Sequence, residues 1–158
     1  MTTDTKIIVG SIAATGLVLI GAIFLLSKNT AKPQTSQENI VATNGLHWHP
    51  RLEIDINGKK QVLANGIGLG TLHQEMHTHE EDYKDGIVHM EMQGLVTNDE
   101  TKLGRFFEIW KKTFNSSQIF EYKNSSEAGV KMFVNGKEII EFENYHMRDK
   151  DSILIRYE

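Results

Sequence analysis

The feature that most constrains this fold is a strand pattern that occurs twice around the dipeptide Asn-Gly. In RLEIDINGKKQVLA, apolar and charged residues alternate up to Asn57-Gly58, and in VKMFVNGKEII the apolar Val130, Met132 and Val134 occupy alternate positions up to Asn135-Gly136. Alternation with a period of two is typical of a strand with one buried face. Asn-Gly favours the type I′ turn, which needs positive φ at both central residues. The sequence therefore predicts two antiparallel hairpins, and SILIRYE predicts a further strand at the end of the chain.

One amphipathic helix is expected between these hairpins. In KLGRFFEIWKKTF, apolar side chains recur three, four and seven residues apart, at Leu103, Phe106, Phe107, Trp110 and Phe114. This spacing gives one apolar stripe that packs on a core. Asp99 or Thr101 is the expected N-cap of the helix. Strands with a single packed helix predict an α+β domain that is mostly antiparallel β, with a β-grasp-like C-terminal part.

An uncharged stretch at residues 7–27 predicts a membrane anchor. About 20 apolar residues in a helix span the hydrocarbon core of a bilayer. A cleavable signal peptide usually has a shorter apolar stretch and a small-x-small cleavage site, and FLLSKNTAKP offers no such site. We therefore expect a short tail at 1–6, an uncleaved transmembrane signal-anchor helix at 7–27, a flexible linker at 28–44 and an extracytoplasmic domain at 45–158.

The amino-acid composition argues against several classes of binding partner and of metal or disulfide site. The chain has 17 Lys and Arg against 21 Asp and Glu, which argues against nucleic acid as a partner, because phosphate binding needs clustered basic residues. It contains no cysteine, which excludes disulfides, thiolate zinc sites and iron–sulfur clusters. A metal site in such a chain is most naturally built from histidines.

Five of the seven histidines lie at strand spacing in two separate parts of the chain. His47 and His49 form one His-x-His pair in GLHWHP, and His77 and His79 form a second in HTHEEDYKDGIVHME, which returns with His89. Residues two apart in a strand point to the same face. If the segments around His77 and His89 pair as a hairpin, opposed Cβ atoms lie about 4.5–5.5 Å apart. This pattern predicts a shared metal site.

Imidazole ligands suit zinc or copper, so we expect one of these ions. Glu80 and Glu91 are the expected hydrogen-bond acceptors for the imidazole N–H groups. The acidic run at residues 80–85 otherwise reads as a solvated turn. Met90 and Met92 alternate with His89, so they are expected to pack in the core rather than to bind the ion.

The two remaining histidines are expected to lie outside the site. His146 is expected to make an ordinary hydrogen bond. HQEMH, which begins at His73, superficially resembles the zinc protease signature H-E-x-x-H, but its Glu75 is in the wrong place.

Four blocks of the chain resemble an uncharacterised family of small prokaryotic membrane-anchored proteins. They are GLHWHPRLEIDINGK, HTHEEDYKDGIVHMEM, LGRFFEIWKKTF and VNGKEIIEFENYHMRDKDSILIRYE, and the family pattern is HxH, LHTH, GIIHxE and LGxFFxxW. The resemblance covers nearly all of residues 45–158. It implies one N-terminal span and an exported domain, with no particular activity, and it makes the same five histidines the ligand candidates. The chain departs from the pattern in a longer loop after HTHEE and at Lys111, where the family often has Gly.

The sequence therefore predicts a single-pass, membrane-anchored extracytoplasmic protein that uses its histidines to bind or transfer copper or zinc, or to stabilise its fold. One alternative is a zinc hydrolase or hydratase, in which three histidines leave a position for water. No second carboxylate is placed as a general base, so we expect a binding protein rather than an enzyme. Another alternative is an accessory subunit of a membrane complex, whose glycine-containing span packs on partner helices.

Overall fold

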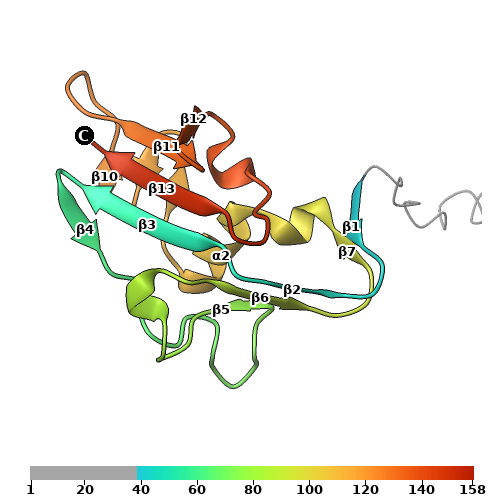
Figure 1. Cartoon of the computed structure of the whole chain (residues 1–158). Helices are drawn as coiled ribbons and strands as arrows, with labels where there is room; N and C mark the ends of the chain where they lie inside the picture. Colours follow the sequence, from blue (N-terminus) through green and yellow to red (C-terminus); the bar gives the residue numbers. More distant parts are fainter. Residues whose placement is uncertain (1–38) are drawn as a thin grey trace, which may run out of the picture. The chain divides into compact units, whose positions relative to one another are not determined.

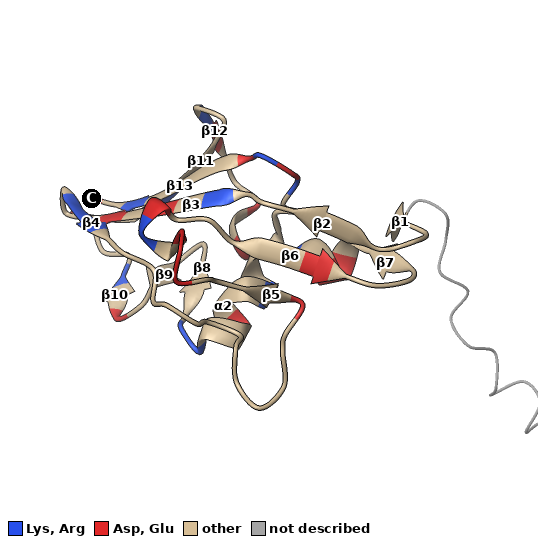
Figure 2. Ribbon diagram, turned by 60° about the horizontal axis from the view of Figure 1, so that its bottom comes forward, with Lys and Arg blue, Asp and Glu red and all other residues tan. Residues whose placement is uncertain are grey.

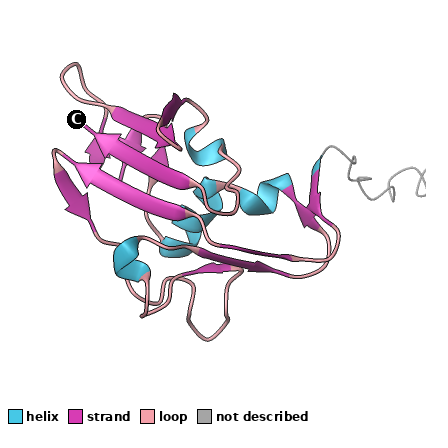
Figure 3. Cartoon of the chain, in the orientation of Figure 1, coloured by secondary structure: helices cyan, strands magenta, loops and turns pink. Residues whose placement is uncertain are grey.

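The computed structural model describes residues 39–158. The predicted tail at 1–6, the signal-anchor at 7–27 and most of the linker therefore lie outside the described residues. Within 39–158 the protein is mostly antiparallel β with one α-helix, which agrees with the predicted α+β class (Figure 1; Figure 3). A search of the described residues for a helix long and apolar enough to cross a membrane found none.

The largest sheet has five strands in the order β12-β11-β13-β3-β4 (Figure 1). It contains both predicted hairpins, β3 (Arg51–Ile56) with β4 (Lys59–Gln61) and β11 (Val130–Val134) with β12 (Lys137–Ile139). The last strand, β13 (Ser152–Tyr157), pairs antiparallel with β11 and parallel with β3. It therefore joins the two hairpins into one sheet.

Both Asn-Gly turns have the predicted backbone. Asn57 and Gly58 have φ of 52° and 76°, and Asn135 and Gly136 have φ of 51° and 80°. Positive φ at both central residues is the requirement of a type I′ turn, whose twist matches that of the flanking strands.

One face of the five-stranded sheet forms a wall of the core. Every second residue of β3, β11 and β13 is buried, and their neighbours are half-buried or exposed. The buried side chains are Leu52, Ile54, Ile56, Val130, Met132, Val134, Ile153, Ile155 and Tyr157. Each such side chain contributes about 1.5–3 kcal/mol when it is fully buried.

The opposite face of this sheet is polar. Basic and acidic residues are interspersed along β3, β4 and β13 (Figure 2). Glu53 pairs with Arg51 at 2.9 Å and with Lys60 at 3.2 Å. These pairs are solvent-accessible, so they contribute little to stability.

The predicted helix is present but shorter than expected. It is α2, Leu103–Trp110, and it buries Leu103, Phe106 and Phe107. The helix ends because Lys111 adopts the left-handed conformation, with φ of 58°. Phe114 lies beyond the helix, and its ring stacks on Phe107 with 4.6 Å between centroids.

The predicted N-cap of the helix was wrong. Asp99 and Thr101 lie inside a 3-10 helix, η3 (Asn98–Thr101), and the N-cap of α2 is Lys102. Thr97 caps η3, with its amide and hydroxyl donating to the Glu100 carboxylate at 2.6 and 2.7 Å. Side-chain spacing does not distinguish a 3-10 turn that leads into a helix from the first turn of the helix itself.

Three smaller sheets complete the domain. The order β2-β6-β5 joins β2 (Leu46–Trp48), β6 (His89–Met92) and β5 (Met76–His77). A second sheet joins β8 (Phe114–Asn115), β9 (Gln118–Ile119) and β10 (Tyr122–Lys123), and a third joins β1 (Ile40–Ala42) and β7 (Val96–Thr97). The short 3-10 helices η2 and η4 are Tyr83–Asp85 and Phe142–Asn144.

The small strands β1 and β8 to β10 were not predicted. Strands of two or three residues carry too little periodicity to be distinguished from a loop. β1 lies within the segment expected to be a linker, so the folded domain begins before Gly45, the predicted boundary.

The sheet that carries the histidines is joined to the main sheet at Pro50. The Pro50 carbonyl accepts from the Val88 amide at 3.0 Å, and the Leu52 amide donates to the Gly86 carbonyl at 2.8 Å. Gly86 has φ of 81°, and a Cβ there would clash with the Leu52 carbonyl. Only glycine allows this close approach, which holds β6 in line with β3.

The turn before β13 is held by a buried carboxylate. Asp151 is 6% exposed. It accepts from the Tyr145 hydroxyl at 2.7 Å, the Arg148 amide at 2.8 Å and the Asn135 side chain at 3.0 Å. Burial, followed by this hydrogen bond and the charge of Asp151, raises the pKa of Tyr145. The contacts tie the second Asn-Gly turn to β13.

Replacing Lys111 by glycine is expected to stabilise the domain by about 1 kcal/mol, because glycine adopts the left-handed conformation without a steric cost. Urea denaturation of the Lys111→Gly variant measures the effect. Lys112→Gly is the control: Lys112 has no positive φ, so glycine there is expected to destabilise. Equal effects of the two changes would contradict this explanation of the helix end.

The Tyr145→Phe variant is expected to lose about 1.5–3 kcal/mol at neutral pH, the range for a hydrogen bond to a charged group. Because folding raises the pKa of Tyr145, its contribution is complete below the unfolded pKa of about 10 and is lost as pH rises through the folded-state pKa. The stability gap between wild type and variant should therefore narrow above about pH 10. Urea denaturation at several pH values measures this gap, with Tyr83→Phe as the control. A gap that does not change with pH would contradict the assignment.

Candidate metal centre

β6 lies between β2 and β5 and sets the positions of the histidines (Figure 1). Its Glu91 lies opposite His47 of β2, and its His89 lies opposite His77 of β5. The predicted hairpin between the segments that contain His77 and His89 is therefore confirmed. Since His89 and Glu91 share one face of β6, His47 and His77 join the same face.

The other face of this sheet packs in the core. Met76 and Met90 are fully buried, and Met92 is 5% exposed. This confirms the predicted core positions of Met90 and Met92. The three-stranded sheet therefore has one apolar face and one face that carries imidazoles.

Four ligand atoms gather at the β5 side of this face. They belong to His77, His79, His89 and Glu91, and they all lie within 4.8 Å of one another. The Nε2 atoms of His77 and His79 are 3.1 Å apart, and Glu91 Oε1 lies 4.0 Å from His77 Nε2. A tetrahedral ion about 2.0–2.1 Å from each nitrogen separates its ligands by roughly 3.3–3.4 Å. The four side chains therefore fit one ion after small rotations.

A second group gathers at the β2 side. His47, His49 and His89 offer ligand atoms within the same limit of 4.8 Å. The ring centroid of His49 lies 4.6 Å from that of His47 and 4.7 Å from that of His89. All five predicted histidines thus come together in two groups that share His89, and we call these five histidines together with Glu91 the histidine cluster.

Two hydrogen bonds determine which ring nitrogens remain available. His77 Nδ1 lies 3.0 Å from the Gln74 carbonyl oxygen, which leaves Nε2 with its lone pair. His89 Nε2 lies 2.8 Å from Asp82 Oδ2, which leaves Nδ1. A carbonyl or carboxylate that accepts from the far nitrogen orients a ligating imidazole and makes it more basic.

Asp82 corrects the sequence-based interpretation of the acidic run. That run was interpreted as a solvated turn, but Asp82 pairs with His89, and its second oxygen is buried without a hydrogen-bond partner in the described residues. The turn brings Asp82 back because the amide of Tyr83 donates to the His79 carbonyl at 3.1 Å. Spacing alone did not show which carboxylate of the run returns to the sheet.

His73 is the contact that sequence analysis missed. Its Nε2 lies 3.3 Å from both ring nitrogens of His77. Residues 73–77 form no helix, so the metalloprotease pattern has no structural basis here. Sequence spacing gave no signal for this contact, because His73 lies outside β5 and the chain bends at Glu75.

The loop that contains His73 covers His77. Thr78 anchors this loop, since its hydroxyl donates to the Ala64 carbonyl at 2.8 Å and accepts from the Ile67 amide at 3.0 Å. Gly68, with φ of 75°, lies against the Met76 carbonyl, and a Cβ there would be 3.1 Å from that of His77. This packing leaves the His77 side chain 0% exposed.

Burial favours the neutral form of two of the histidines. It is the main cause of the lowered pKa of His77, and the charges of His73 and His79 lower that pKa further. The pKa of His49 is lowered by burial and then by the charges of His89 and His47. Neutral imidazole is the form that binds a metal ion. These two rings are therefore available as ligands at neutral pH.

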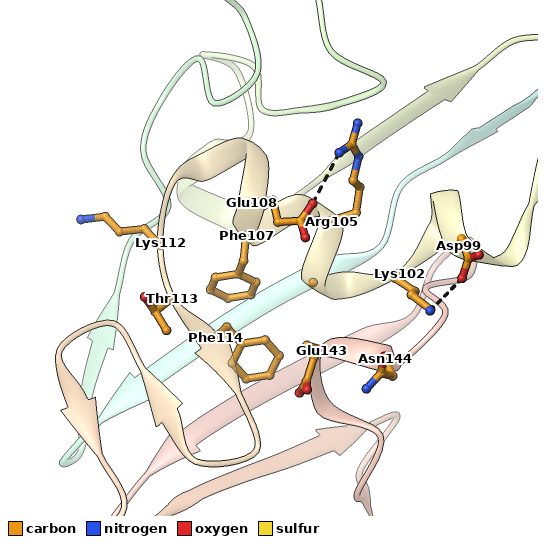
Figure 4. Close-up of a pocket in the computed structure, with 11 residues that line it drawn as sticks. Asp99, Lys102, Arg105, Phe107, Glu108, Lys112, Thr113, Phe114, Glu143 and Asn144 are labelled. Atoms are coloured by element: carbon orange, nitrogen blue, oxygen red, sulfur yellow. Dashed lines mark hydrogen bonds and ion pairs between the residues drawn. The ribbon is translucent and has the colours of Figure 1, made fainter.

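An open groove of about 560 Å³ borders the cluster, and it is lined by Leu46, His47, His73, Gln74, Glu75, Glu91, Met92 and Gln93. Another hollow, of about 440 Å³, lies beside α2 (Figure 4). Four of its charged side chains pair with one another, Lys102 with Asp99 at 2.7 Å and Arg105 with Glu108 at 3.4 Å. These four charges neutralise one another in pairs. Beside the first groove, in contrast, ligand atoms of several side chains lie close enough together to hold one ion.

His146 lies outside the cluster, as predicted. Its Nδ1 is 2.8 Å from the Asn98 carbonyl oxygen, an ordinary hydrogen bond.

Comparisons of the chain with family models, with curated proteins and with solved structures gave no match. The function is therefore argued from the site itself.

Proposed function

We propose that this protein binds a transition metal ion, copper or zinc, through the histidine cluster, and that it serves metal binding, transfer or structural stabilisation. The observation that carries the proposal is the convergence of imidazoles from three strand segments on one face of a sheet. The orientation of His77 by a carbonyl and of His89 by a carboxylate supports it further, because metal-binding histidines have such partners.

The donor set supports zinc or copper(II). Imidazole with one carboxylate suits these ions. A thioether ligand would favour copper(I), but Met76, Met90 and Met92 are buried on the opposite face of the sheet. These methionines therefore support a site without sulfur.

We also propose that residues 7–27 form a single-pass signal-anchor helix and that the domain is extracytoplasmic. The uncharged length of this segment supports the anchor. The hairpin of β11 with β12 and the pairing of β11 with the last strand, β13, support the β-grasp-like C-terminal part.

Metal analysis of the purified full-length chain tests the proposal. After incubation with Zn²⁺ or Cu²⁺ and removal of the excess, elemental analysis is expected to find stoichiometric metal, because the cluster offers at least three ligands. His77→Ala combined with His79→Ala should reduce the metal content, and the control His146→Ala should retain it. Absence of bound metal from the wild type, or equal content in all three proteins, would refute metal binding at the cluster.

Asp82→Asn is expected to lower the metal affinity about 10–100-fold, the usual effect of losing the partner of a ligating histidine. The carboxamide no longer attracts the His89 N–H as a carboxylate does. Competition against a chelator of known affinity measures the change. Asp85→Asn is the matched control, since Asp85 is an exposed residue of the neighbouring 3-10 helix. A similar effect of both substitutions would indicate a general charge effect instead.

A further inference from the structure

The histidine cluster consists of two stations that share one residue. His77, His79 and Glu91 form the inner station, and His47 and His49 form the outer station, with His89 belonging to both. The two stations occupy neighbouring positions on the same face of the sheet, because β6 pairs with β2 on one side and with β5 on the other.

The stations differ in their access to solvent. The His47 side chain is 62% exposed, whereas that of His77 is 0% exposed. The open groove beside the cluster is lined by His47, His73 and Glu91, and the loop that contains His73 covers His77. Among the imidazoles, an ion that arrives from solvent therefore meets His47 of the outer station before His77 of the inner one, while the 44% exposed Glu91 is open to solvent as well.

His89 has one nitrogen to offer. Its Nε2 is held by Asp82, so Nδ1 is the nitrogen with a free lone pair. One lone pair coordinates one ion, which means that His89 serves either the outer or the inner station at a given time. The stations are therefore alternatives for one ion and do not form a two-metal centre.

Glu91, the exposed member of the inner station, also lies close to the outer station. Its Oε1 is 3.2 Å from His47 Nε2 and 4.0 Å from His77 Nε2. A carboxylate has two oxygens and several lone pairs, so it can contact an ion leaving His47 before that ion reaches His77.

We infer that a single ion is captured at the outer station and passes to the inner station, exchanging His47 and His49 for His77, His79 and Glu91 while His89 remains bound. The exchange breaks two metal–nitrogen bonds and forms two metal–nitrogen bonds and one metal–oxygen bond. It involves no change in oxidation state, and water that completes the outer coordination is released. This inference rests on the proposed metal-binding function.

The test uses the full-length chain with Zn²⁺ as the only metal. Elemental analysis gives the number of zinc ions bound per chain. The rate of zinc uptake is measured by stopped-flow, from the release of zinc by a chromophoric chelator. The wild type should bind one ion. The outer variant, His47→Ala with His49→Ala, should also bind one ion with similar affinity. Its uptake should be slower by roughly tenfold, because capture at the surface raises the local concentration of the ion.

The inner station is tested by His79→Ala, because His79 is less buried than His77 and its truncation disturbs the packing less. This variant should retain the fast uptake but bind zinc on the order of 100-fold more weakly, since losing a ligand costs at least as much as losing its hydrogen-bond partner. Circular dichroism of the metal-free variants checks that they are folded. The control is again His146→Ala.

Three outcomes would overturn the inference. Two zinc ions per wild-type chain would show that the stations are occupied together. Unchanged uptake in the outer variant would show that His47 and His49 take no part in entry. Loss of zinc affinity in the outer variant as large as that in His79→Ala would show one undivided site. Each of these leaves metal binding intact, whereas a wild type that binds no zinc or copper would refute the proposed function itself.

Discussion

The register of β6 against its two neighbours is the constraint on which the candidate site depends. A shift of one residue in either pairing would move every side chain of a strand to the other face. It would turn Met90 and Met92 outward and drive His89 and Glu91 into the core. The burial of the methionines therefore determines where the imidazoles point. In this protein, the hydrophobic packing of the methionines on one face of a small sheet therefore fixes the positions of the histidines and Glu91 on the other face.

This small sheet has little core of its own and depends on its connection to the larger sheet. The chain passes from β2 to β3 through Pro50, and the hydrogen bonds beside Pro50 and Gly86 hold β6 in line with β3. The parallel pairing of β3 with β13 then ties this path to the end of the chain. Residues far from the histidines in the sequence, including the buried Asp151, whose carbonyl accepts from the Arg51 amide at 2.8 Å, therefore support the geometry of the cluster.

The cluster itself combines burial with crowding. Burial lowers the pKa values of His77 and His49, and the charges of neighbouring imidazoles lower both further. Lone pairs are thus kept available at neutral pH. At His89, Asp82 holds one ring nitrogen and thereby orients the other toward the cluster. Solvent exposure therefore differs across the cluster: the His47 side chain is exposed, and the His77 side chain is fully buried.

The sequence by itself determined the elements with strong local signals. The two Asn-Gly hairpins, the apolar stripe of α2 and the common face of each His-x-His pair follow from turn chemistry and from the periods of helix and strand. Only the tertiary structure decided the strand order, the division of the histidines into two groups and the roles of Asp82 and His73. These features depend on how loops return to a sheet. Contacts between residues that are far apart in the sequence produce no repeating pattern along the chain. Local sequence patterns therefore could not predict these contacts.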